Sequence, residues 1–111
     1  MIKAAMAMAL SDAVVRENND KRLARYEETF NSFITDIISK IENMILDKTK
    51  SGAYIIYDIN IQHVYEVNSF SIPGFKVMEA IGKELSSAGY GFTVNYDADP
   101  DLFCDLDIYW N

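Results

Sequence analysis

The strongest pattern in the sequence is a run of apolar residues spaced three and four apart between residues 20 and 50. This spacing is typical of one face of an α-helix. The apolar face comprises Leu23, Tyr26, Phe30, Phe33, Ile34, Ile37, Ile38, Ile41, Met44 and Ile45. Asn18-Asn19-Asp20 offers N-cap residues before this face, and Ser51-Gly52 offers a stop after it. The pattern therefore predicts a long helix over residues 20–50.

The first 19 residues form a separate pattern that begins with a run rich in Met and Ala. Ser11 is a candidate helix cap, and we expect Val14 and Val15 to face inward. We predict a short helix or arm over residues 1–19, divided from the long helix by the polar run at residues 18–20. One continuous helix through that run is the alternative.

The period of the apolar pattern changes from helical to two after Gly52, which is typical of a strand. Ile55, Tyr57, Ile59 and Ile61 alternate with a second set of residues that is itself partly apolar. We therefore predict a strand here. The following stretch, residues 63–72, fits either a further strand or a loop.

A second helix is predicted to begin at Pro73-Gly74 and to end at Gly89. Its inner face is expected to carry Phe75, Met78, Ile81 and Leu85. The remainder of the chain has the pattern of two short strands joined by a turn.

The two strands at the end of the chain each have one apolar face. These faces comprise Phe92, Val94 and Tyr96 in the first strand, and Cys104, Leu106, Ile108 and Trp110 in the second. Residues 97–101, which include Pro100, form the turn. We therefore predict an α+β fold in one domain, residues 1–111: N-terminal helices pack on a small, mainly antiparallel sheet of three or four strands. A second helix lies between strands of the β-α-β-β half, residues 53–111.

Charge is distributed unevenly along this pattern. The chain has 10 basic and 17 acidic residues, a net charge of −7. Residues 53–111 contain two lysines and nine acidic residues, so the whole excess lies in the second half. This distribution disfavours direct binding of nucleic acid or of anionic lipid. We find neither a membrane-spanning run of about 18 apolar residues nor a secretory signal pattern, and we expect a cytoplasmic protein.

Five acidic residues fall close together near the C-terminus with no basic residue among them: Asp97, Asp99, Asp101, Asp105 and Asp107. They fit a solvated face or a contact surface for a basic partner. The first three have the opening spacing of a calcium loop, but Leu102 and Ile108 stand where such a loop needs Gly and Glu. We therefore expect no metal site.

Aromatic residues suggest two interaction surfaces. Six of the seven tyrosines lie in residues 53–111, and tyrosine is favoured at protein interfaces. We predict that Tyr54, Tyr96 and Tyr109 join the five aspartates in a partner-binding surface; covering a small sheet is their alternative role. Residues 20–48 of the long helix would span roughly 43 Å by the rise per residue, which exceeds a compact body of this size. We therefore predict a homo-oligomer, a dimer or larger, whose interface comprises Tyr26, Phe30, Phe33, Ile37 and Ile41.

Groups suited to catalysis are scarce. His63 is the only histidine, and the sequence has no Gly-x-Ser-x-Gly motif and no glycine-rich phosphate loop. Cys104, the only cysteine, is expected to be a buried thiol whose pKa the neighbouring acids raise. We expect no catalytic residues, no cofactor and no enzymatic activity.

The second half of the chain resembles a recurring type of small tailed-phage accessory protein. The matching pieces are a helix ending in Gly-Tyr (Leu85–Tyr90), a strand (Phe92–Tyr96) and a final strand that closes on Asp-Ile-Tyr-Trp (Leu106–Trp110). The resemblance implies an accessory protein made inside a bacterium, and small acidic phage proteins often bind and block a host factor. Together with the segregated charge and the scarcity of catalytic groups, this leads us to predict a non-enzymatic protein of the host cytoplasm that binds and inhibits a host or defence protein with a basic surface. The alternatives are a small structural or assembly component of a virion and a small metal-dependent enzyme.

Overall fold

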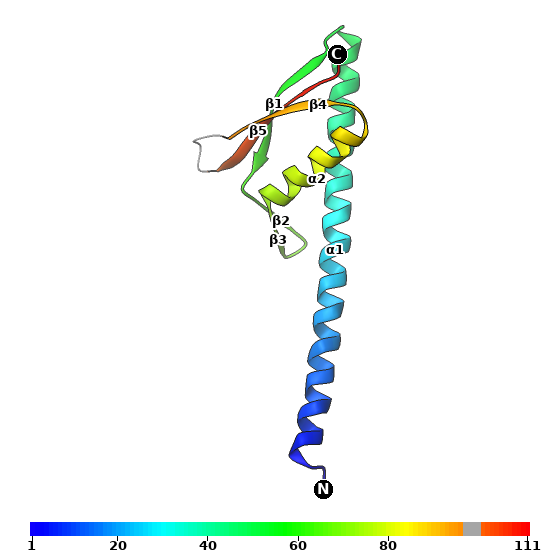
Figure 1. Ribbon diagram of the computed structural model, residues 1–111, viewed down its shortest axis with the longest axis vertical. Coiled ribbons are helices and arrows are strands. Elements are labelled where there is room, and N and C mark those ends of the chain that lie inside the picture. Colours follow the sequence, from blue (N-terminus) through cyan, green and yellow to red (C-terminus); the bar gives the residue numbers. More distant parts are fainter. Residues whose placement is uncertain (97–100) are drawn as a thin grey trace.

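The computed structural model describes residues 1–96 and 101–111 and has the α+β fold that the sequence predicts (Figure 1). A long helix is followed by three strands, a second helix and two further strands. In chain order these are α1 (Ala4–Lys50), β1 (Ile55–Gln62), β2 (Val64–Val67), β3 (Phe70–Pro73), α2 (Gly74–Ser87), β4 (Gly91–Asn95) and β5 (Leu102–Tyr109).

The strands form two antiparallel units. The main sheet has the order β1-β5-β4, with β5 in the centre and β1 and β4 at the edges. The register pairs Ile56 of β1 and Phe92 of β4 with Ile108 of β5. The predicted hairpin of the last two strands is therefore confirmed. The second unit is the separate hairpin β2–β3, which fills the stretch that the sequence left open.

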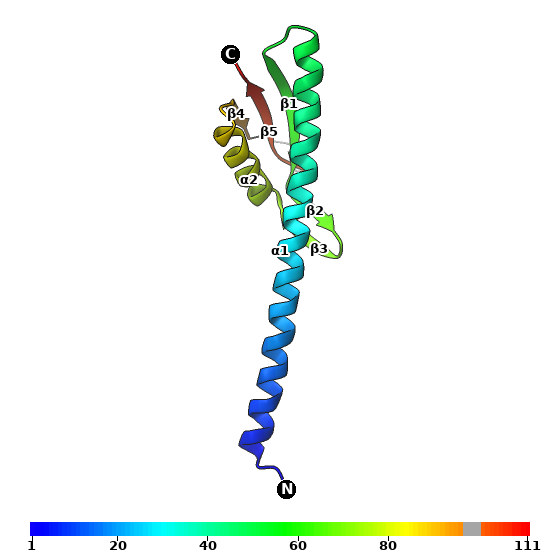
Figure 2. The same cartoon turned by 90° about the vertical axis from the view of Figure 1, so that its right-hand side faces the viewer.

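The hydrophobic core lies between the main sheet and the two helices. Figure 2 shows α1 beside β1, with α2 packed over the sheet further from α1. The fully buried side chains include Ile61, Leu106 and Ile108 of the sheet and Ile81 of α2. Burying side chains of this size typically stabilises a fold by about 1.5–3 kcal/mol each. The core thus depends on the C-terminal half of α1, α2 and one face of the sheet.

The first helix runs without a break from Ala4 to Lys50, so the predicted division at residues 18–20 is wrong and the continuous alternative is correct. Asn and Asp are weak helix formers but do not break a helix as Pro does. An ion pair between Glu17 and Lys21, 3.1 Å long, spans the polar run within the helix. The helix ends at Lys50 with Ser51 as its C-cap, and Gly52 follows with a φ of +80°, as expected for the stop.

The N-terminal half of α1 projects away from the body (Figures 1 and 2). Its 47 residues make a helix about 70 Å long, and the whole chain extends 77 Å along its longest axis. Val14 and Val15 are exposed, so the prediction that they face inward is wrong. Leu23, the first residue of the predicted apolar face, is exposed as well. Only the later part of the apolar face reaches the core, where Ile41 and Ile45 are buried.

A bulge in β1 changes which residues face the core. Asp58 has a φ of +60°, and the pairing of β1 with β5 shifts between Ile56 and Ile59. Because one extra residue reverses the alternation, Ile56 is buried before the bulge and Ile61 after it. Tyr57, which belongs to the same alternating set as Ile61, is exposed over 63% of its surface. This explains why both sets of alternating residues are apolar.

The second helix also differs from its predicted inner face at one position. Met78, Ile81 and Leu85 are buried as expected, but Phe75 is 55% exposed and Val77 is buried instead. Phe75 lies in the first turn of α2, at the side of the helix that is turned toward β4. This exposure places the Phe75 ring in a groove between α2 and β4.

Candidate functional site

The outer face of the main sheet carries acidic residues and no basic ones. Along β5, the half-buried Asp105 and Asp107 alternate with the buried Cys104, Leu106 and Ile108. β1, β4 and β5 contain no Lys or Arg, because both lysines of residues 53–111 lie on α2. In the described strands, every charged residue on the face that points away from the helices is therefore acidic.

Asp107 has a structural function on this face. One carboxylate oxygen accepts a hydrogen bond of 3.0 Å from the backbone N–H of Asp58 in the β1 bulge. The other accepts one of 3.2 Å from the side-chain amide of Asn95 on β4. Asp107 thus joins all three strands of the sheet, and only part of its surface remains available to a partner.

The remaining acidic residues of the predicted surface occupy different environments. Asp101 is exposed, and its backbone carbonyl accepts a hydrogen bond from the His63 N–H. Asp105 is half-buried beside Cys104. Asp97 and Asp99 lie outside the described residues. The described part of the chain therefore places Asp101, Asp105 and Asp107 on or next to β5.

The three predicted interface tyrosines lie at the margins of the sheet. Tyr54 precedes β1, is exposed, and accepts the Trp110 N–H with its carbonyl. Tyr96 follows β4, is 74% exposed, and contacts the Phe103 ring edge-on at 5.5 Å. Tyr109 is 37% exposed and lies over β4. The sequence analysis did not identify Tyr57 as an outward residue, because both sets of alternating positions in this strand are apolar and the pattern does not show which set faces the core.

The predicted oligomer-interface residues make contacts within their own chain. Tyr26 packs edge-on against Phe70 of β3 at 5.5 Å, and Phe33 lies 5.0 Å from the ring of Tyr65 of β2. Ile41 is buried in the core. Phe30 and Ile37 are half-buried against the same core. Their role between copies stays a prediction, and the unpartnered apolar surface of α1 lies closer to its N-terminus.

The two groups with catalytic potential occupy structural positions. The backbone carbonyl of His63 accepts the Gly74 N–H at 2.6 Å, and its ring lies 5.9 Å from that of Phe103. Cys104 is fully buried, as expected. Burial, and secondarily the negative charge of Asp105, raises the pKa of its thiol, which keeps it protonated and unreactive near neutral pH. The described residues contain no cluster of three metal-ligating side chains.

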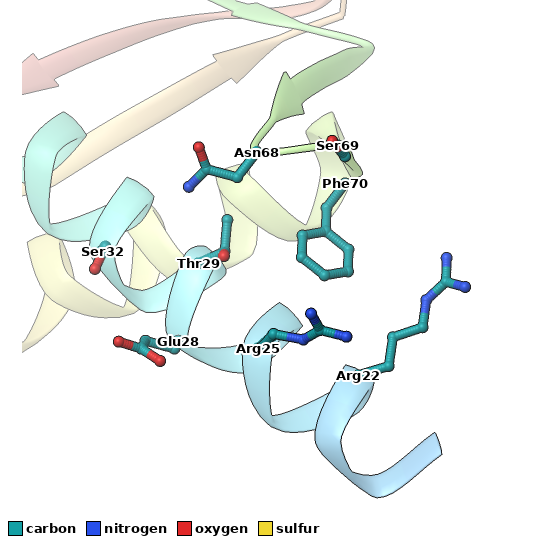
Figure 3. Close-up of a pocket in the computed structure, with 8 residues that line it drawn as sticks. All are labelled: Arg22, Arg25, Glu28, Thr29, Ser32, Asn68, Ser69 and Phe70. Carbon is teal, nitrogen blue, oxygen red and sulfur yellow. The ribbon is translucent and has the colours of Figure 1, made fainter. Parts of the chain in front are cut away.

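A polar hollow lies between α1 and the tip of the β2–β3 hairpin (Figure 3). It has a volume of about 590 Å³, and its lining includes Arg22 and Arg25 of α1 and Phe70 of the hairpin. Neither guanidinium forms an ion pair within the described part of the chain. Glu28 on the same wall offsets one of the two positive charges. The hollow therefore carries only a small net positive charge.

A second and more apolar groove runs between α2 and the edge strand β4, with a volume of about 720 Å³. Its apolar walls comprise Phe75 and Met78 of α2, Phe92 and Val94 of β4, and the flanking Tyr96 and Phe103. The sequence pattern missed this groove, because it assigned Phe75 to the core.

No helix in the described segments combines the length and apolar character needed to cross a membrane. Comparison of the chain with protein-family models, with curated proteins and with solved structures finds no match.

Proposed function

We propose that this chain is a non-enzymatic binding protein that engages a basic surface of another protein through the outer face of its main sheet. The observation that carries the proposal is the combination of acidic and tyrosine side chains on a face with no Lys or Arg in its strands. Such a face attracts a positively charged partner electrostatically and offers aromatic contact area once the partner has docked.

The exposed tyrosines support this role because they leave large apolar surfaces in water. Tyr57 of β1 is 63% exposed and Tyr109 of β5 is 37% exposed. Each directly follows a buried core residue, Ile56 or Ile108, so both lie on the outer face of the sheet. Interfaces are enriched in tyrosine, and a few such residues commonly supply most of the binding energy. In the setting implied by the resemblance to small phage proteins, the partner is a host or defence protein, and binding inhibits it.

The test compares two matched variants that remove the same kinds of groups. The first carries Asp58→Asn, Asp101→Asn and Tyr57→Ser on the sheet, and it leaves the Asp107 hydrogen bonds in place. The control carries Asp36→Asn, Glu42→Gln and Leu46→Ser, three exposed positions on α1. A bacterial protein captured by the wild type is identified by mass spectrometry and purified, and its affinity for each chain is measured at several salt concentrations.

We expect the sheet variant to bind the captured protein at least tenfold more weakly and the control to bind as the wild type does. The wild-type affinity should fall as salt is added, because salt screens the attraction between exposed charges. Equal binding by the wild type and the sheet variant would overturn the proposal.

The projecting part of α1 favours one second candidate, an assembly component. Met6, Met8 and Leu10 are more than half exposed on the part of α1 that projects from the body. A helical segment that is apolar on all sides is usually buried. For this role we expect the chain to co-purify with assembled particles, and its absence from purified particles would exclude the role.

A further inference from the structure

Strand β4 forms a free edge of the main sheet. One side of Gly91–Asn95 pairs with β5, and among the described strands none pairs with the other side. In Figure 2, β4 lies on the side of the sheet away from α1. Backbone N–H and C=O groups along this free side are available to a further strand.

This edge lacks the features that usually prevent strands from adding to a sheet. Natural edges are protected by charged residues, by Pro, by bulges or by a covering element. β4 has the sequence Gly-Phe-Thr-Val-Asn, without charge or Pro, and its pairing with β5 is regular. The opposite edge, β1, is interrupted by the bulge at Asp58 and lies beside α1. Only one of the two edges is therefore open to a strand.

The groove beside β4 has the shape that the side chains of an added strand need. Phe92, Val94 and Tyr96 line it at every second position, which is the period of a strand. Across from them, α2 contributes Phe75 and the small Gly82. A Cβ at residue 82 would lie 3.1 Å from the Phe92 ring, so the absence of a side chain there lets this ring pack closely against α2 and form the floor between the two elements.

We propose that β4 and this groove bind an extended segment of the partner protein, which adds to the sheet as a fourth strand. Its inward side chains are apolar and occupy the groove, and its outward side chains are basic. This inference rests on the proposed function, because it states how the acidic face and its basic partner meet. Binding at a sheet edge beside a helix uses backbone hydrogen bonds for affinity and alternate side chains for specificity.

The basic character of the segment follows from its distance to the acidic residues. Adjacent strands lie about 4.8 Å apart, so an added strand would lie about 10 Å from β5. Asp105 and Asp107 of β5 point to the outer face, where Thr93 and Asn95 of β4 separate them from the edge. Lys and Arg side chains are long enough to cross one neutral strand and reach these carboxylates.

Charge also disfavours the other simple occupant of the edge, a second copy of β4. Pairing of two copies would bring together two chains of net charge −7 and would join their acidic outer faces. Like charges that face each other across an interface oppose association. A basic segment would instead be attracted to the acidic outer face. The edge therefore favours a basic segment of another protein over a second copy of β4.

The test uses an octapeptide of alternating Lys and Val, labelled for fluorescence anisotropy, and the full-length chain. Two N-methylated forms of the peptide are compared, one methylated on every Val and one on every Lys. In a strand, alternate N–H groups point to opposite edges, so only one of these forms loses its hydrogen bonds to β4. An octapeptide of alternating Glu and Val controls for charge.

Two protein variants test the groove. Phe75→Ser removes an exposed ring from the groove, and Leu46→Ser removes an exposed side chain of α1 as the matched control. We expect the Lys-Val peptide to bind the wild type and Leu46→Ser equally. Binding by Phe75→Ser should be about tenfold weaker. One N-methylated form should lose binding, and the Glu-Val peptide should not bind.

Equal binding of both N-methylated forms, or unchanged binding by Phe75→Ser, would overturn the inference, because the peptide would then be held by charge alone. No binding of the Lys-Val peptide, with a dimer that Phe75→Ser dissociates, would also overturn it and would assign the edge to a second copy. The sheet variant described above separates the two proposals. If the sheet variant no longer binds the captured protein and the Lys-Val peptide does not bind the wild type, only the strand-addition inference is overturned.

Discussion

The ring of Tyr109 on β5 lies over Gly91 on β4, in the space that a side chain at residue 91 would occupy. The two residues are direct partners in the antiparallel register. A glycine in a strand exposes backbone and adds no packing, and an aromatic ring across from it compensates for both losses. The contact fixes the first residue of β4 to the central strand and so stabilises the edge on which the proposed strand addition depends.

Replacing Gly91 by Ala should destabilise the fold through this contact. A Cβ at that position would overlap the Tyr109 ring, and overpacking of this kind typically costs about 1–3 kcal/mol. The free energy of unfolding, measured by urea denaturation, should fall accordingly. In a Tyr109→Ala background the same substitution should cost much less, because the space is then empty. Equal costs in the two backgrounds would show that the ring does not limit residue 91.

Removing the Asp107 carboxylate should destabilise the sheet although the residue is only half-buried. In Asp107→Ala, the Asp58 N–H of the bulge and the Asn95 amide both lose their acceptor. Because both hydrogen bonds are exposed to solvent, their loss should cost about 0.5–1.5 kcal/mol each. Asp36→Ala on the exposed surface of α1 is the control and should change the free energy of unfolding by no more than about 0.5 kcal/mol. Similar values for the two variants would contradict the structural function of Asp107.

The stability of the fold should decrease at alkaline pH. Burial, and then the charge of Asp105, raises the pKa of the Cys104 thiol in the folded chain. Burial also raises the pKa of the Tyr65 hydroxyl, against the opposing effect of the hydrogen bond that it accepts from the Gln62 N–H. Groups with a raised pKa in the folded state lose their proton first in the unfolded chain. Their contribution is therefore complete below the pKa of the unfolded thiol, about 8.5, and is lost as pH rises through the folded pKa.

Urea denaturation of the wild type and of Cys104→Ala between pH 7 and pH 10 measures this effect. The free energy of unfolding of the wild type should fall above about pH 8.5. The variant is less stable at neutral pH, because the substitution leaves a small cavity, but its free energy of unfolding should fall less steeply. Parallel curves would show that the thiol does not contribute to the pH dependence.

The fold was predictable where one pattern dominated and local signals agreed with it. Lys48 and Lys50 in the last turn, with Gly52 after it, correctly mark the end of α1. Pro73-Gly74 likewise marks the start of α2. The polar run at residues 18–20 misled the prediction, because capping residues act as caps only where the chain leaves the helix. Inside a helix, the same residues only lower its propensity slightly.

The candidate sites were less predictable, because they depend on tertiary contacts. The bulge at Asp58 turns Tyr57 outward, and its hydrogen bond to Asp107 links residues 49 positions apart. The turn at Asn68 and Ser69, both with positive φ, makes a hairpin from a stretch with no glycine. The groove beside β4 exists only because α2 packs with Phe75 away from the core. None of these contacts produces a periodic pattern of apolar and polar residues, so the sequence alone does not reveal them.

The exposed arm of α1 leads to a last prediction about assembly. The chain exposes 7926 Å² of surface, whereas a compact monomer of 12.6 kDa exposes about 6,200 Å². The excess of about 1,700 Å² per chain exceeds the roughly 800 Å² that each partner contributes to a standard interface. The exposed apolar residues of the projecting arm include Met6, Met8, Leu10, Val14 and Val15. Their burial between copies would remove this apolar surface from water.

We therefore expect light scattering across a dilution series to show a dimer or a larger assembly for the full chain. A chain that lacks residues 1–15 should be monomeric and should keep its free energy of unfolding at high dilution, because these residues contact no other part of the body. A variant with Met6, Leu10 and Val14 replaced by Ser should behave as the shortened chain does. If the shortened chain kept the mass of the full assembly, the arm would not hold the copies together. The interface would then lie elsewhere on the body, and the Phe75→Ser variant would show whether β4 forms it.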